Sequence, residues 1–276
     1  MSTSSDRNGA TGVVIDKVVK RFRSAGRAEE IVALDHVSLD VEPGCVVAIV
    51  GSNGAGKSTL LSVIAGSILA DEGRVVVGGR DIAGLPSWKR SRSVARVRQD
   101  PTQNVFGSLS IEENFALRRA GSRGRFTLGR AVGRGMREEA RAALAQFGMG
   151  LEDRMHSLAS TLSGGQRQAV AVAMATMARP EVLLLDEHVA ALDPKSARLV
   201  NARTLAAVRE AAITTLIVTH DMAHALEHSD RLLMFHRGRI VMDLDQEAKD
   251  QLDVPQLVER FEELAGASVS DRSLLA

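Results

Sequence analysis

The segment from Gly51 to Ser58 constrains the fold more than any other part of the sequence. It has the spacing G-x-x-x-x-G-K-S, follows the apolar run at residues 46–50, and opens a helical pattern at residues 57–65. Glycines between a buried strand and a helix let backbone N–H groups converge on an anion, and the positive N-terminal end of the helix favours negative charge. The segment therefore predicts a phosphate-binding loop at the carboxyl end of a buried strand.

Each position of this loop has an expected role. Lys57 would reach the β- and γ-phosphates of a nucleotide, and the Ser58 hydroxyl would coordinate Mg²⁺. A glycine-rich turn without a ligand is the alternative interpretation, and the intact spacing disfavours it. The predicted nucleotide-binding positions are Gly51, Ser52, Asn53, Gly54, Ala55, Gly56, Lys57, Ser58 and Thr59.

Strand-like and helical segments alternate along much of the chain. Continuous apolar runs suit strands covered on both faces, and their alternation with helices is typical of a mainly parallel α/β sheet. Residues 13–19 and 37–41 instead alternate in polarity, as half-buried strands do. The buried runs are residues 46–50, 182–185 and 213–218, and the helical stretches are residues 57–65, 166–177 and 196–211.

The middle of the chain differs, because residues 111–159 show amphipathic helical patterns and no buried strand. This predicts a helical insertion, with a subdomain at about residues 100–161 of one domain spanning residues 12–245. An Arg- and Gly-rich loop at residues 121–137 is either a solvated surface or a contact to anionic lipid or an acidic partner. Its arginines are Arg123, Arg125, Arg130, Arg134 and Arg137.

The two ends are predicted to lie outside this domain. Residues 1–11 are polar and without periodicity, which indicates a disordered lead-in. Residues 246–276 form a short tail with one helical segment at residues 255–264, too short for a separate regulatory domain.

Two carboxylates, Asp186 and Glu187, end the apolar run at residues 182–185. Successive side chains of a strand point to opposite faces, so the two cannot share one role. Asp186 is the predicted Mg²⁺ ligand, and Glu187 is the candidate general base or water-positioning group. An acidic helix cap is the alternative, which the nearby phosphate-binding loop disfavours.

His220 follows the apolar run at residues 213–218 in the same way. Gly51, Asp186 and His220 each lie just beyond an apolar run, and ligands of open parallel sheets bind at that carboxyl edge. His220 is therefore predicted to donate to the γ-phosphate or to hold the attacking water, with a packing role as the alternative. The histidines without comparable placement, interpreted as structural or exposed, include His188, His224 and His228.

A second glycine pair lies in Ser163-Gly-Gly-Gln166. The spacing predicts a capping box that opens the helix at residues 166–177. A cap does not need two glycines, which weaken a helix by about 1 kcal/mol each relative to alanine. Bare N–H groups at a helix start suit an anion brought from outside.

The motifs, taken in order, resemble those of ATP-binding cassette (ABC) ATPases over about residues 13–245. The resemblance implies a P-loop NTPase sheet core with N-terminal antiparallel strands and an inserted helical subdomain, acting on ATP with Mg²⁺. The matching segments are Gly51 to Ser58, Gln99, and residues 162–168, 182–187 and 191–193, followed by His220.

Further roles follow from this resemblance alone. In the family two cassettes pack head to tail, so Ser163, Gly164, Gly165 and Gln166 would contact the γ-phosphate held by a partner chain, and Asp193 would couple the two sites. Gln99 would touch metal or water and link the sheet core to the insertion, as both a catalytic and a metal-site residue. Phe22, the only aromatic residue before Gly51, would stack on adenine unless it is an ordinary core residue.

Residues 84–90, 96–101 and 185–194 resemble ATPases of tryptophan/tyrosine uptake systems, with His188 where proline is more usual. This implies the ATP-hydrolysing subunit of a bacterial importer for a small solute such as an aromatic amino acid. It would work as a homodimer at the cytoplasmic face of the plasma membrane, with permeases docked near residues 102–114 and, indirectly, an extracytoplasmic substrate-binding protein.

Composition narrows the alternatives, which are an exporter ATPase and a non-transport ATPase acting on nucleic acid or ribosomes. A net charge of +1 gives no reason to expect a nucleic-acid partner, because that needs a concentrated basic face. The chain also lacks the second cassette or zinc-binding cysteines usual in non-transport members. No stretch approaches the roughly 20 apolar residues of a membrane span, so a membrane role must come through a partner.

Overall fold

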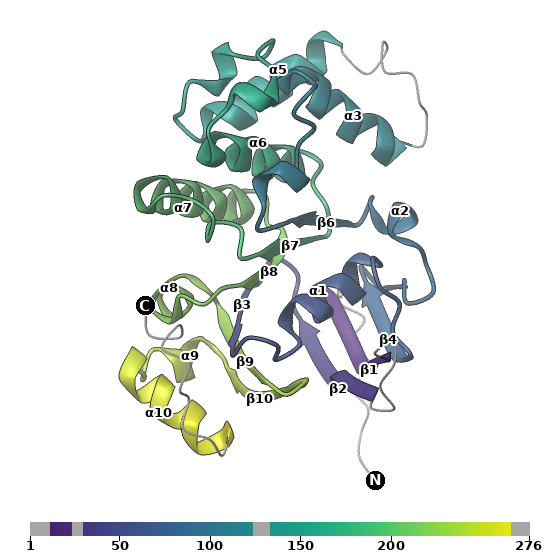
Figure 1. Ribbon diagram of the computed structural model, residues 1–276, viewed down its shortest axis with the longest axis vertical. Helices are drawn as coiled ribbons and strands as arrows, with labels where there is room; N and C mark the ends of the chain where they lie inside the picture. The colour runs from purple at the N-terminus through teal and green to yellow at the C-terminus, as the bar shows by residue number, and fades with distance from the viewer. Residues whose placement is uncertain (1–11, 24–29, 124–132, 266–276) are drawn as a thin grey trace.

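Two β-sheets flanked by helices form the structure, a computed structural model that describes residues 12–23, 30–123 and 133–265 (Figure 1). The predicted lead-in at residues 1–11 lies outside the described residues. The predicted α/β fold with an antiparallel N-terminal sheet is confirmed.

The larger sheet has the strand order β10-β9-β3-β8-β7-β6. Its strands are parallel except β10, which pairs antiparallel with β9. Every residue of β3 and β8 is buried, as expected for strands covered on both faces. Polarity patterns alone did not reveal β6, β9 and β10. The bounds are β3 Val46–Gly51, β6 Val94–Val97, β7 Val182–Asp186, β8 Thr214–Val218, β9 Arg231–His236 and β10 Arg239–Leu244.

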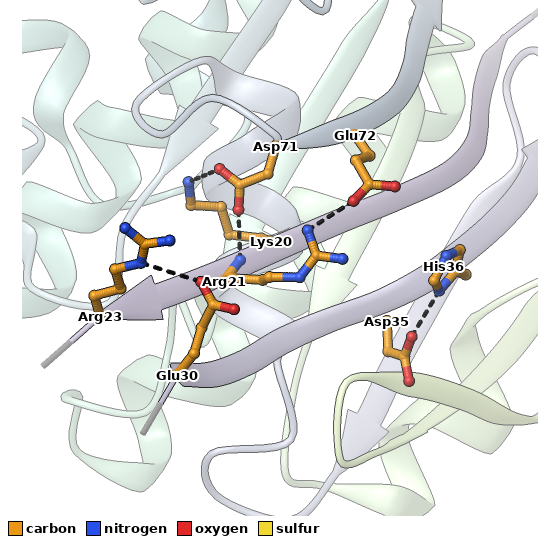
Figure 2. A network of polar contacts seen from close by, with 8 residues as sticks. All are labelled: Lys20, Arg21, Arg23, Glu30, Asp35, His36, Asp71 and Glu72. Atoms are coloured by element: carbon orange, nitrogen blue, oxygen red, sulfur yellow. Dashed lines mark hydrogen bonds and ion pairs between the residues drawn. The ribbon is translucent and has the colours of Figure 1, made fainter. Parts of the chain in front are cut away.

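The smaller sheet is antiparallel, with the order β2-β1-β4-β5. Polar side chains pair across its strands (Figure 2), where Asp71 accepts hydrogen bonds from Lys20 Nζ at 2.8 Å and Arg21 N at 2.6 Å. Exposed pairs of this kind stabilise by at most about 1 kcal/mol each, so they contribute little to the stability of the fold. The bounds are β1 Val13–Arg23, β2 Glu30–Val41, β4 Glu72–Val77 and β5 Arg80–Asp81.

Opposite faces of the larger sheet carry different helices. On β7, Leu183 and Leu185 pack with α6, whereas Val182 and Leu184 pack with α1 and the smaller sheet. This alternation follows from the two-residue period of a strand. The helices of the core are α1 Lys57–Ala65, α2 Ser87–Arg90, α6 Gly164–Met177, α7 Pro194–Glu210 and α8 Met222–His228.

The helical insertion packs around α6 at one end of the molecule (Figure 1), with Phe115 and Phe147 fully buried among its helices. Its Arg-rich connection is shorter than predicted, because Arg134 and Arg137 belong to α5 and pair with Glu138 and Glu112. Arg123 ends α3, while Arg125 and Arg130 lie outside the described residues. The bounds are α3 Ile111–Arg123, α5 Arg134–Ala145 and the 3₁₀ turns η1 Pro101–Gln103, η2 Leu151–Asp153 and η3 Ala159–Thr161.

The segment after β10 packs on the sheet domain through α9 Gln246–Lys249 and α10 Val254–Ala265. Leu257 and Phe261 of α10 are buried against β10 and α8. Within the three described ranges, no helix combines the length and apolar character needed to cross a membrane.

Candidate nucleotide site

The loop after β3 leaves the first turn of α1 without a side-chain cap. The N-cap residue, Gly56, has φ 106° and accepts no Cβ, because one would lie 2.3 Å from the Ala33 carbonyl oxygen of β2. Glycine meets both demands. The free N–H groups of a helix start attract anions, so this turn is suited to phosphate.

Lys57 is the buried cation of this loop. Only 7% of it is exposed, and its Nζ donates to the carbonyl oxygens of Gly51 at 2.6 Å and Ser52 at 2.9 Å. The ammonium group is thus folded back over the loop. Of the other predicted positions, Asn53, Gly54 and Ser58 are exposed, Ala55 is buried, and Thr59 is half-buried.

Ser58 and Asp186, the two predicted Mg²⁺ ligands, lie next to each other. The Ser58 hydroxyl donates to Asp186 Oδ1 at 2.9 Å. Hydroxyl and carboxylate oxygens are the donors Mg²⁺ prefers, and this ion keeps several non-protein ligands. No cluster of three acidic, His or Cys ligands occurs in the described ranges, so the residues fit Mg²⁺ completed by phosphate and water rather than a closed protein cage.

Arg96 on β6 was not predicted, yet it touches the same carboxylate. Its NH2 lies 2.5 Å from Asp186 Oδ2 and its NH1 donates to Ser62 Oγ at 3.0 Å. Both side chains of the ion pair are nearly buried, at 13% and 14% exposure. The sequence signal was one arginine inside the otherwise apolar strand β6.

Glu187 and His220 face each other across the ends of β7 and β8. His220 Nδ1 lies 4.0 Å from Glu187 Oε2, and both side chains are partly exposed. Glu187 has φ 45°, a conformation uncommon outside glycine, and its N–H donates to the Val218 carbonyl at 3.0 Å. Backbone strain of this kind concentrates at functional sites.

Gln99 is exposed just beyond β6 and lines a cleft of about 360 Å³ together with Asp186 and Arg96. The three side chains therefore share one solvent-accessible space. A metal ion or water bound to Asp186 would therefore lie in the cleft that Gln99 also lines.

The second glycine pair opens α6. Ser163 Oγ accepts from Gln166 N at 3.2 Å, and Gln166 Oε1 accepts from Ser163 N at 3.1 Å, so the predicted capping box is confirmed. Gly165 also has a packing reason that sequence reasoning missed, because a Cβ there would lie 2.8 Å from Ser196 Cβ on α7. Gly164 has only an ordinary contact, 3.5 Å from Leu192.

Asp193 caps α7 beside this pair. Its Oδ1 accepts from Ser196 N at 3.0 Å, and hydrogen bonds from Ser196 lower the pKa of the Asp193 carboxyl. Ser196 thus contacts both Gly165 and Asp193, which places the two predicted interface segments in one unit.

Phe22 lies on β1 and is 38% exposed, which excludes the core alternative. Lys20 Nζ lies 5.6 Å from its ring centroid. Its register partner is Ile31 on β2, two residues from the Ala33 carbonyl that abuts Gly56. The ring therefore lies on the strand pair that flanks the phosphate-binding loop.

The histidines predicted to be structural or exposed include His188, which is buried, and the neighbouring pair His224 and His228. His188 is 2% exposed, and burial, with a smaller effect of His224, lowers its pKa to about 3, so the imidazole is neutral near pH 7. His224 lies close to Asn201 through Nε2, and burial lowers its pKa. His228 contacts the His224 ring edge-on, at 4.4 Å between centroids.

Comparisons with known proteins agree with this geometry. A family model described as ABC transporter matches residues 34–190. A tyrosine transport ATP-binding protein of Clostridioides difficile is 40% identical over 83% of this chain and 90% of its own length. A phosphonates import ATP-binding protein of Frankia casuarinae is 38% identical over 90% of this chain and 94% of its own length.

Solved structures are similar as well. An ATP-binding cassette solved as a dimer bound to ADP and phosphate has a TM-score of 0.72 at 27% identity, covering 85% of this chain and 98% of that one. Another cassette of an ABC transporter, in its ADP conformation, has a TM-score of 0.75 at 26% identity, covering 94% of this chain and all of that one. The chain therefore belongs to the ABC transporter family, as an ATP-binding subunit that hydrolyses ATP.

Proposed function

We propose that this subunit energises the import of a small solute, an aromatic amino acid, from the cytoplasmic face of the plasma membrane. The observation that carries its chemistry is convergence at one sheet edge, where Ser58 lies 2.9 Å from Asp186 and His220 lies 4.0 Å from Glu187. The substrate class is supported by the 40% identity to a tyrosine transport ATP-binding protein.

The residues at this edge divide the work of hydrolysis. Mg²⁺ held by Ser58 and Asp186 would neutralise charge on the β- and γ-phosphates. Lys57 would leave its carbonyl partners for the phosphate oxygens. Glu187 would take the proton of the attacking water as the new O–P bond forms and the bond to the ADP oxygen breaks, with His220 holding the γ-phosphate.

We also propose a head-to-tail homodimer as the working enzyme. The ATP on one subunit would meet Ser163, Gly164, Gly165 and Gln166 of the second copy, while Asp193 couples the sites. The helix start at Ser163 belongs to α6, and α6 and α1 cover opposite faces of the larger sheet. Support for the dimer comes from the cassette solved as a dimer with ADP and phosphate.

Permease subunits would dock near residues 102–114, which run from just after Gln99 into the first turn of α3. Phe106 in this segment is 61% exposed, and Asn114 holds its backbone through hydrogen bonds to both N and O. A rigidly held, exposed aromatic side chain suits a protein interface. An extracytoplasmic binding protein would then deliver the solute to the permease.

Reconstitution tests the transport role. The chain is purified with its membrane partner from detergent extracts and placed in proteoliposomes with the binding protein. We expect tyrosine, tryptophan or phenylalanine to raise ATP hydrolysis and to be taken up. Stimulation by methionine or a phosphonate alone would overturn the substrate class, movement in the opposite direction would overturn import, and absence of any membrane partner would overturn the transport role.

A further inference from the structure

His188 combines burial with an unsatisfied polar atom next to Glu187. The side chain is 2% exposed, and its Nε2 has no hydrogen-bond partner among the described residues. Leaving a buried polar group unsatisfied costs about 1–3 kcal/mol, so such groups are almost always paired with protein or ordered water. The surroundings of His188 therefore need a partner for Nε2.

A small cavity of about 20 Å³ adjoins this side chain. One water occupies roughly 10–15 Å³ by the same measure, so the cavity has room for a single molecule. Besides His188, the polar residues that line the cavity are Glu187, Thr219, His220, His224 and Asn201, and Val189, Ala190, Ile217 and Val218 form the rest of its wall. The wall is therefore mixed, but its polar side chains offer a water the two to four partners that it needs, which a purely apolar cavity does not.

Several of these polar groups already have partners. Thr219 Oγ1 accepts from Asp221 N at 3.0 Å, and His224 Nε2 is engaged with Asn201. Glu187 and His220 line the same cavity, and their side chains lie 4.0 Å apart. That separation is too long for a direct hydrogen bond and is a spacing at which water bridges.

We propose that this cavity is a binding site for one structural water, which bonds to His188 Nε2 and holds Glu187 and His220 in register. His188 is then a positioning residue, which acts on the Glu187 carboxylate through the bound water. This inference rests on the proposed role of Glu187 in hydrolysis.

Two substitutions separate positioning from packing. His188→Leu fills similar space without polar atoms, and we expect kcat to fall about 10-fold with an unchanged KM for ATP, the lower end of the range for groups that orient a functional residue. His188→Gln places an amide nitrogen near the former Nε2 and should restore most of the parental kcat. His228→Leu removes a neighbouring imidazole outside the cavity and serves as the matched control.

A readout independent of turnover accompanies the kinetics. High-resolution crystal structures of the nucleotide-free parent and of His188→Gln should contain one ordered water in the cavity, which His188→Leu lacks. Thermal unfolding checks that all three variants fold. Parental kcat in a folded His188→Leu variant, or a parental cavity without water, would overturn the inference.

The same set of proteins includes Glu187→Gln. If Glu187→Gln is inactive while His188→Leu is fully active, only the positioning role fails. If Glu187→Gln itself keeps parental activity, the proposed role of Glu187 fails. The crystal structures then still show whether the cavity beside His188 binds a water.

Discussion

The starts of α1 and α6 both carry glycines, and they differ in whether a side chain caps their N–H groups. The start of α1 has Gly56 at the N-cap and no side-chain cap, whereas α6 begins with a complete capping box between Ser163 and Gln166. An uncapped helix start needs an outside partner for its N–H groups, but a capped one is stable alone. The difference supports the proposal that α1 binds the phosphates of its own subunit and that α6, already capped, meets those of the second copy.

Glu187→Gln gives the largest expected effect and separates ATP binding at the start of α1 from ATP hydrolysis. We expect kcat to fall about 10²- to 10⁴-fold, because the amide cannot accept the proton of water. ATP binding should persist, so size-exclusion chromatography with ATP should show an accumulated dimer. Glu181→Gln, an exposed change just before β7, is the control, and parental turnover in Glu187→Gln would contradict the assignment.

Ser163→Arg changes the N-cap of α6. A bulky cation there should block closure on the second copy and lower kcat about 10²- to 10³-fold, the range for loss of transition-state contacts. Binding of ATP to the monomer, followed with a fluorescent analogue, should be unchanged. Ala142→Arg adds the same charge on an exposed face of α5 and should have no effect. Loss of ATP binding in the Ser163 variant would place this serine in the subunit's own site instead.

Lys57→Met tests whether the buried ammonium group serves the ligand or the loop. Losing a charged hydrogen-bond donor costs about 1.5–3 kcal/mol, so affinity for ATP should drop about 10- to 100-fold by calorimetry. The loop carbonyls of Gly51 and Ser52 also lose their donor. If the free energy of unfolding falls while the affinity for ATP stays at the parental value, Lys57 stabilises the loop and does not bind the nucleotide.

Ser163→Ala gives the smallest effect and measures the cap itself. Removing the hydroxyl should lower the free energy of unfolding by about 1 kcal/mol, as for other N-caps, measured by urea denaturation. Ser163→Gly should cost only a few tenths of this value. An unchanged urea midpoint in Ser163→Ala would mean that the capping box contributes nothing in the free subunit.

Sequence periodicity predicted the buried strands β3, β7 and β8 and the helices α1, α6 and α7, because continuous apolar runs and helical spacing are strong local signals. It missed β9, whose residues pair in parallel with β3 and depend on partners far away in sequence. Arg96, the packing of Gly165 on Ser196 and the buried His188 were missed for the same reason. Each acquires its role only when distant elements meet.

The ion pair between Arg96 and Asp186 bears on how the subunit folds after synthesis. A lone carboxylate in a nearly buried position would oppose folding, but here a guanidinium from the neighbouring strand β6 offsets its charge. The newly synthesised chain can therefore complete its sheet before any nucleotide or divalent ion arrives. Folding of the subunit and binding of its nucleotide can therefore be separate events.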